Sequence, residues 1–410
     1  MIKRIAAVAA TAALLAGAGV SSADADDDQT VRIATFNASL NRNAAGELLR
    51  QLNDGTNEQA RNAAETIQRA RPDIVLINEF DYEPDLRAAK AFHDNYLKVP
   101  QRGAEPVEYP HMWAGPVNTG VPSGHDLNND GTVGGPEDAF GFGQFPGQYG
   151  FVLYSKYPIN QGSVRTFQKF LWKDMPSNLI PEGWYSAEAL SELRLSSKTH
   201  ADIPVQVGSH TLHILAAHPT PPSFDGPEKR NKRRNNDEIR LWADYISGKA
   251  DYLYDDSGAR GGLPDGESFA ILGDYNSDPV DGDSWPGSID ALLKNSLVLD
   301  PKPVSAGAVE AAKRQGGANN SHLGDPALDT ADFNDAPRPG NIRVDYTLLS
   351  AKTMSAKDSA VFWPKRDDPL FRLVGEHPFP TSDHRLVWVD AQFRAGPDQP
   401  LLPKLPNTGR

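Results

Sequence analysis

Short apolar runs of strand length alternate with helix-like stretches along most of this chain, and this alternation limits the folds open to it. A continuous apolar run of about four to eight residues indicates a buried strand, whereas apolar residues recurring every three or four positions indicate a helix. The pattern predicts helices over residues 57–70, 85–97 and 236–246. It predicts strands over residues 31–36, 73–77, 150–154, 212–217, 269–272, 344–349 and 386–393. This mixture favours a layered α/β (α+β) architecture over a helical bundle or an all-β sandwich.

Two long stretches follow neither pattern. Residues 100–148 and 301–340 are rich in Gly, Pro, Asn and Asp, and both are longer than an ordinary connection between elements. We therefore expect one domain over residues 26–394, with both stretches as insertions over one face, where functional residues are common. A Pro-rich tail over residues 395–410 follows.

The first residues have the composition of a secretory signal peptide. A basic pair precedes an apolar run over residues 5–20, and small residues suit cleavage after Ala23 or Ala25. We therefore predict that residues 1–25 are removed and that the chain is exported, either secreted or periplasmic. A membrane-spanning helix is the weaker alternative, because the run is shorter than the roughly 20 residues that a bilayer requires and acidic residues follow at once.

The other end contains Leu-Pro-Asn-Thr-Gly at residues 405–409, which resembles the sorting signal of Gram-positive wall-anchored proteins. Only Arg410 follows, whereas that signal requires an apolar span and a basic tail. We favour chance similarity within a Pro-rich tail and keep cell-wall anchoring as a minority interpretation. No transmembrane segment is predicted in the mature chain.

The charge balance bears on the substrate. The chain has 41 basic and 54 acidic side chains, a formal net charge of -13, which argues against a broad electropositive surface for gripping duplex DNA. A local basic groove is still allowed. The sequence contains no Cys, so the stability of an exported chain of this length would rest on its core rather than on disulfides.

Polar side chains with catalytic potential lie at the ends of the predicted strands. A sheet brings such ends to a common edge, so we expect these side chains to meet there. Each one taken singly has an ordinary explanation as a turn, a cap or a solvated charge. The set consists of Asn37, Glu79, His218, Asp274 with Asn276, Asp345, and Asp383 with His384.

Taken in order, this set resembles the endonuclease/exonuclease/phosphatase superfamily, from Val31 to about Phe393. The strongest segments are PDIVLINE at residues 72–79, GDYNSDP at residues 273–279 and SDH at residues 382–384. The chain departs from the usual pattern at two positions, with Asn78 in place of Gln and Tyr275 in place of Phe. The resemblance implies a four-layer αββα sandwich, in which two packed β-sheets carry helices outside, and a phosphoesterase activity.

The resemblance also implies roles for individual residues. Asp274 would orient or deprotonate the attacking water, and Asn276 would donate to the phosphate. His384, held by Asp345, would face the phosphoryl group, and His218 would be the second imidazole. Which group moves which proton stays open.

A phosphate ester repels its nucleophile, and a hard divalent cation offsets that charge. Mg²⁺, or Mn²⁺ in its place, prefers one or two carboxylates together with water and substrate oxygens. These preferences fit Glu79 as the principal ligand, with Asn37 and Asp383 close by. Asn37 is also a candidate contact to the substrate.

A basic run at residues 229–234 is unusual in so acidic a chain. Arg230 and Arg234 are predicted to bind the anionic substrate through bidentate guanidinium groups. Lys232 and Arg233 are interpreted as part of a solvated face. The remaining candidates, Lys198 and His200, are weaker.

The first insertion contains a complete calcium-loop template. The predicted ligands are Asp126, Asn128, Asp130, Thr132 through its carbonyl, and Glu137. The flanking residues are poor helix formers, so we expect a solitary loop that stiffens the insertion rather than an EF-hand. The alternative is a turn without an ion.

We therefore predict an exported, divalent-metal-dependent phosphoesterase that hydrolyses phosphate mono- or diesters by water attack at phosphorus. A small phosphoester is favoured over duplex DNA, and no protein partner is implied. A secreted nuclease of the same superfamily is one alternative. A non-catalytic, calcium-stiffened surface module is the other, although such a module would not need the candidate catalytic residues.

Overall fold

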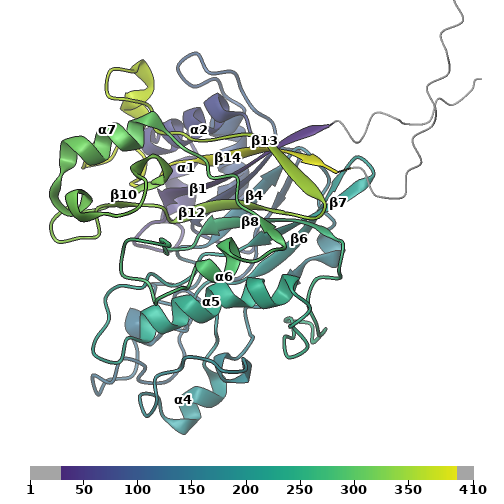
Figure 1. Cartoon of the computed structure of the whole chain (residues 1–410), viewed down its shortest axis with the longest axis vertical. Coiled ribbons are helices and arrows are strands. Elements are labelled where there is room, and N and C mark those ends of the chain that lie inside the picture. The colour runs from purple at the N-terminus through teal and green to yellow at the C-terminus, as the bar shows by residue number, and fades with distance from the viewer. Residues whose placement is uncertain (1–28, 395–410) are drawn as a thin grey trace, which may run out of the picture.

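The structure, a computed structural model, describes residues 29–394 and contains two packed mixed β-sheets with helices outside them (Figure 1). The first sheet has the order β13-β14-β1-β2-β4-β3, and the second has the order β5-β6-β7-β8-β12-β9. This arrangement confirms the predicted sandwich. The predicted signal peptide and Pro-rich tail lie outside the described residues.

The strands of each sheet come from distant parts of the chain. The first sheet consists of β1 (Thr30–Leu40), β2 (Ile74–Phe80), β3 (His111–Trp113), β4 (Phe151–Ser155), β13 (Met354–Val361) and β14 (Val387–Phe393). The second consists of β5 (Arg165–Thr166), β6 (Ala201–Val207), β7 (His210–Ala216), β8 (Ser268–Asp274), β9 (Val298–Leu299) and β12 (Asp345–Ser350). A separate ribbon pairs β10 (Ala331–Asp332) with β11 (Asn341–Ile342).

Apolar side chains from both sheets form the central core. Alternate residues of β1 and β2 meet alternate residues of β6, β7 and β8 there, because successive side chains of a strand point to opposite faces. This core includes Ile33, Leu76, Ile203, Ile214 and Leu272, all of which are fully buried. It fixes the two sheets face to face and thereby sets the position of the polar side chains at their ends.

Helices cover the two outer faces (Figure 1). On the first sheet lie α1 (Glu47–Leu52), α2 (Glu58–Ala70) and α3 (Arg87–Phe92), which packs with a π-helical turn over His93–Leu97. On the second lie α5 (Arg230–Ile246) and α6 (Asp290–Leu293). The shorter α4 (Ala187–Glu192) and α7 (Ala306–Gln315) lie in the connecting segments. No helix within residues 29–394 has both the length and the apolar composition needed to cross a bilayer.

The sequence pattern predicted most core elements but missed several others. All seven predicted strands are present with shifted ends, whereas α5 begins at Arg230 rather than at residue 236. Strand β6 was missed because Asp202 and Pro204 interrupt its apolar pattern, and β13 because its middle residues are polar and partly exposed. The second predicted insertion contains α7 and β10 and therefore has more regular structure than its composition indicated.

The strand directions bring the candidate residues to one edge. Strand β1 runs parallel to β2 with Asn37 opposite Asn78, and β8 runs antiparallel to β12 with Asp274 opposite Asp345. Strand β7 runs parallel to β8, so His218, the second residue after β7, emerges at the same edge as Asp274.

Candidate active site

A buried carboxylate between two imidazoles forms the centre of the candidate site. Asp274, at the end of β8, is 1% exposed. Its Oδ2 atom lies 3.3 Å from Nε2 of His218 and 3.6 Å from Nε2 of His384. His218 follows β7 of the second sheet and His384 precedes β14 of the first, so each sheet supplies one imidazole.

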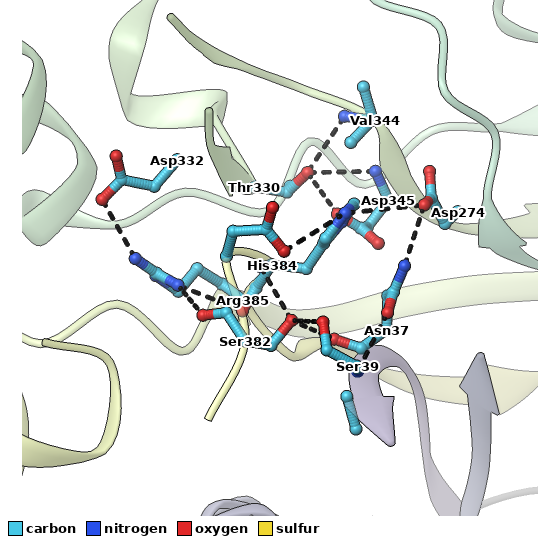
Figure 2. A network of polar contacts seen from close by, with 12 residues as sticks. Asn37, Ser39, Asp274, Thr330, Asp332, Val344, Asp345, Ser382, His384 and Arg385 are labelled. Carbon is cyan, nitrogen blue, oxygen red and sulfur yellow. Dashed lines mark hydrogen bonds and ion pairs between the residues drawn. The ribbon is translucent and has the colours of Figure 1, made fainter. Parts of the chain in front are cut away.

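A second carboxylate holds His384 from its other side (Figure 2). Nδ1 of His384 lies 2.9 Å from Oδ2 of Asp345, the first residue of β12. Asp345 and His384 are both buried, so their interaction is little screened by water. This group of two carboxylates and two imidazoles, the Asp–His cluster, consists of Asp274, Asp345, His218 and His384.

The pKa values of the two imidazoles shift in opposite directions. Burial by itself lowers the pKa of His384, but the Asp345 and Asp274 carboxylates outweigh burial and raise it well above its ordinary value. Burial, and then the positive charge of Lys198, lower the pKa of His218, although Asp274 opposes the shift. His384 is therefore favoured as the imidazolium and His218 as the neutral ring.

The pKa values of the Asp274 and Asp345 carboxyl groups also shift in opposite directions. Burial disfavours ionisation of Asp274, yet the charges of His384 and His218 hold its pKa well below the usual range. Burial raises the pKa of Asp345 to about 6, against the lowering effect of His384. At neutral pH both groups are therefore mainly carboxylates, and Asp274 is the more firmly ionised of the two, as a group that accepts a proton from water must be.

Two asparagines complete the contacts of Asp274. Nδ2 of Asn37 donates to Oδ2 of Asp274 at 3.1 Å, and the Asn276 amide N–H donates to Oδ1 at 2.9 Å. The Asn276 side chain donates to the carbonyl of Pro219 at 3.1 Å, which fixes its orientation beside His218. The structure therefore gathers Asn37 and Asn276 at the Asp–His cluster.

The predicted metal ligands lie at the same edge. Glu79 is half-buried near the end of β2, with no hydrogen bond or ion pair to its carboxylate among the described residues. Asp383 is half-exposed, and its Oδ1 atom lies 4.0 Å from Nε2 of His384. Oδ1 of Asn37 accepts from the Ser39 amide at 3.1 Å and keeps a second lone pair. A carboxylate without a donor, an amide oxygen and a second carboxylate form an oxygen donor set that fits a hard divalent cation.

The backbone at two of these positions is strained. Glu79 and Asn276 adopt left-handed conformations, with φ of 58° and 51°. This conformation costs a residue such as Glu roughly 1–2 kcal/mol, and it costs Asn less because Asn adopts the left-handed region more readily. Such strain is common at functional sites, where it sets the direction of a side chain.

One group of possible metal-binding atoms lies inside the Asp–His cluster itself. Asp274, Asp345 and His384 offer such atoms within 4.8 Å of one another. Both ring nitrogens of His384 already face carboxylate oxygens, however, so their charges compensate one another without an ion. Glu79 has no such partner, which makes its surroundings the better place for a cation.

Lys198, a weaker candidate from the sequence, is buried close to the Asp–His cluster. Burial lowers the pKa of its amine, and the carboxylates of Glu238, Glu79 and Asp274 oppose that shift. No hydrogen bond or ion pair to its ammonium group occurs within residues 29–394. An unpaired buried cation beside the cluster is available to an anionic substrate.

Other predicted substrate contacts are engaged elsewhere. Arg234 donates to the carbonyls of Phe140, Arg194 and Leu195. Arg230 donates to the carbonyl of Leu127 and pairs with Glu137.

The two guanidinium groups thus tie the first insertion to α5, which argues against the predicted substrate-binding role of Arg230 and Arg234. His200 is also structural, because one ring nitrogen pairs with the Ser196 hydroxyl and the other with the Glu238 carbonyl.

The calcium-loop template is folded as a series of side-chain-capped turns. Asp126 accepts from the amides of residues 130 and 131, and Asp130 accepts from the amide of Thr132. Nδ2 of Asn128 donates to Asp130. Glu137 pairs with Arg230 at 3.2 Å instead of lying with the other carboxylates. Calcium binding by this loop stays a prediction.

The two packed sheets and outer helices form a fold of the phosphoesterase and nuclease type. The family model described as "Endonuclease/Exonuclease/phosphatase family" matches residues 34–384, so the chain belongs to that family. Its members are hydrolases that act on phosphoesters. Comparison with curated proteins finds no match.

Several solved structures are similar to this chain. An endonuclease/exonuclease/phosphatase protein from Beutenbergia cavernae is 17% identical over 89% of this chain and 72% of its own, with a TM-score of 0.46. A family protein from Bacteroides thetaiotaomicron is 13% identical over 90% and 99%, with a TM-score of 0.46. Sphingomyelinase C from Streptomyces griseocarneus is 13% identical over 88% and 99%, with a TM-score of 0.44. Likenesses this distant do not identify a substrate.

Sequence reasoning missed one residue of the site. Thr330 donates to Oδ2 of Asp345 at 2.8 Å (Figure 2). It lies in the second predicted insertion, 15 residues before Asp345 in the chain, and no motif surrounds it. Only the three-dimensional arrangement identifies it.

Proposed function

We propose that this protein is a divalent-metal-dependent phosphoesterase that hydrolyses a phosphate mono- or diester by water attack at phosphorus. The observation that carries the proposal is the Asp274 carboxylate between two buried imidazoles, one of them backed by Asp345. A non-catalytic surface module would have no use for this arrangement, whose burial of charge is costly.

Each residue of the Asp–His cluster has a chemical task in this proposal. Ionised Asp274 orients the attacking water and accepts its proton. The His384 imidazolium, held by Asp345, stabilises the negative charge that develops on the phosphoryl oxygens. His218 and Asn276 bind the phosphoryl group from the β7 side, and Asn37 keeps the Asp274 carboxylate in place.

Glu79, with Asn37 and Asp383, is proposed to hold Mg²⁺ or Mn²⁺. A bound cation at this position would offset the negative charge of the phosphate ester. Support comes from the donor set itself, because the Glu79 carboxylate makes no hydrogen bond or ion pair within the described residues.

Lys198 is proposed to contact the substrate phosphate in place of Arg230 and Arg234. Its position beside Glu79 and Asp274 supports this role. A single lysine near the cluster, in a chain of net charge -13, favours a small phosphoester over duplex DNA. A nuclease activity stays the alternative within the family.

The test is hydrolysis of bis-p-nitrophenyl phosphate and of the monoester, with Mg²⁺ or Mn²⁺. We expect turnover by the wild type and none by Asp274→Ala or His384→Ala, each with an unchanged circular dichroism spectrum. Absence of turnover by the wild type with every metal and both esters would contradict the proposal. A panel of plasmid DNA, RNA, nucleotides, sugar phosphates and phospholipids then separates a small-ester phosphoesterase from a nuclease.

Export is part of the proposal and rests on residues 1–25. Expression of the full chain in a secreting host, followed by N-terminal sequencing, tests it. The mature protein is expected to begin at residue 24 or 26 and to be found outside the cytoplasm. An intact N-terminus in the cytoplasm would contradict it.

A further inference from the structure

The second predicted insertion is joined to the segment that carries His384. Ala331 pairs with His384 in an antiparallel bridge. The Asp332 amide donates to the Asp383 carbonyl at 2.8 Å, and the Arg385 amide donates to the Thr330 carbonyl at 2.8 Å. This short ribbon places the Thr330 side chain directly beside Asp345 (Figure 2).

The hydrogen bonds of Thr330 fix the direction in which its hydroxyl proton points. The hydroxyl oxygen accepts from the amides of Val344 and Asp345, each at 3.0 Å. A hydroxyl group has two lone pairs and one proton, so both acceptor positions are filled. The proton is left for Oδ2 of Asp345, at 2.8 Å.

The same carboxylate oxygen receives the catalytic imidazole. Oδ2 of Asp345 accepts from Thr330 and from Nδ1 of His384, at 2.8 and 2.9 Å, whereas Oδ1 is buried without a partner. Two donors from different segments thus hold one oxygen and fix the rotation of the carboxylate. Without Thr330, His384 would be the only side chain within residues 29–394 that donates to this carboxylate.

We infer that Thr330 is a positioning residue for the proposed reaction, which aligns His384 by locking the orientation of the Asp345 carboxylate. The inference rests on the proposed function. It assigns part of the second insertion to the support of the catalytic imidazole, because the hydroxyl acts on the substrate only through Asp345 and His384.

The test compares Thr330→Val, which keeps the shape of the side chain, with Thr330→Ser, which keeps the hydroxyl. Thr66→Val is the matched control, because it removes a buried hydroxyl in α2 that donates only to the Asn62 carbonyl. Steady-state hydrolysis of bis-p-nitrophenyl phosphate is measured for each, with thermal unfolding in parallel.

For Thr330→Val we expect kcat to fall by about 10- to 100-fold, the usual loss for residues that orient a ligand or catalytic group, with KM within about twofold. Thr330→Ser is expected to recover most of kcat, and Thr66→Val to leave kcat unchanged. If the valine variant does not fold, Thr330→Cys replaces it, with an intermediate loss expected because a thiol is a weaker donor.

Three results would overturn the inference. One is an unchanged kcat in a folded Thr330→Val or Thr330→Cys variant. Another is a loss in Thr330→Ser as large as that in Thr330→Val. The third is a rise in KM with kcat unchanged. Each of these would leave the proposed function intact if the wild type is active, whereas an inactive wild type would overturn both.

Discussion

Two groups of carboxylates, each with at least one buried member, differ in whether cationic neighbours compensate the buried charge. In the Asp–His cluster, Asp274 and Asp345 share two imidazoles, and the pKa of Asp274 is held well below its usual range by them despite burial. The other group, the acidic quartet, consists of Asp278, Asp281, Asp325 and Asp329. Burial, with the three neighbouring carboxylates, raises the pKa of Asp329 to about 9.

The difference lies in the partners rather than in the depth of burial. Asp274 is 1% exposed and Asp329 is 7% exposed, yet within residues 29–394 no donor reaches the side chain of Asp329. Its neighbours Asp278 and Asp281 accept backbone amides instead. A buried carboxylate with cationic neighbours keeps its charge, and one without them keeps a proton.

The largest expected effect is a loss of kcat when the Asp–His cluster is changed but not when the acidic quartet is changed. Asp274→Asn should lower kcat by about 1,000-fold or more, because the amide neither accepts a proton from water nor faces the imidazoles with a negative charge. Asp329→Asn, the matched change in the acidic quartet, should leave kcat within about threefold. Steady-state kinetics on an activated diester measures both. An equal loss of kcat in the two variants would show that the acidic quartet is as important for the reaction as the Asp–His cluster.

Glu79 is a third kind of carboxylate, for which we propose a cation as partner. Glu79→Gln should lower activity by about 100-fold at fixed Mg²⁺ and raise the Mg²⁺ concentration needed for half-maximal rate. Chelation should abolish wild-type activity, and added Mg²⁺ should restore it. Metal titrations of the rate provide the measurement, with Glu58→Gln at an exposed position as control. An unchanged metal dependence in Glu79→Gln would place the cation elsewhere.

The acidic quartet should make the free energy of unfolding depend on pH. The folded state raises the pKa of Asp329 above its unfolded value of about 3.9, so the stability contributed by its proton is complete below pH 4 and is lost as pH rises towards about 9. Asp329→Asn should therefore be more stable than the wild type at pH 8, by about 1–3 kcal/mol, and equal to it at pH 4. Urea unfolding at the two pH values measures this. A stability difference independent of pH would show that Asp329 is ionised.

The smallest expected effect concerns the loop over residues 126–137. Millimolar calcium should raise the melting temperature by a few degrees if the loop binds the ion. Asp130→Ala should remove this shift, and Asp251→Ala, at an exposed position, should retain it. Differential scanning calorimetry with and without calcium measures the shift. A wild type insensitive to calcium would favour the paired state of Glu137 and Arg230 as the resting arrangement of the loop.

The sequence was most informative where a residue type and a strand end coincide. Asp274, Asp345 and His384 could be predicted because they are adjacent to apolar runs that must be buried, and strand ends meet at a sheet edge. The contacts of Arg230 and Arg234 could not be predicted, because most of their partners are backbone carbonyls in segments more than 30 residues away in the chain. Every residue has a backbone carbonyl, so the sequence does not show which of them a side chain will contact.

The missed strands have a similar explanation. Strand β13 is an edge strand with polar outward residues, so pairing with β14 holds it more than burial does. Thr330 lies in a segment of high Gly, Pro and Asp content, and its importance depends on which carboxylate the fold brings beside it.

The strand order has a consequence for protein synthesis. Strand β1 lies between β2 and β14 in the sheet, although β14 is synthesised long after both of them. Asn37 therefore emerges from the ribosome well before His384, which directly precedes β14. A nascent chain that ends before β14 lacks His384, so under the proposed function it would have no ester-cleaving capacity.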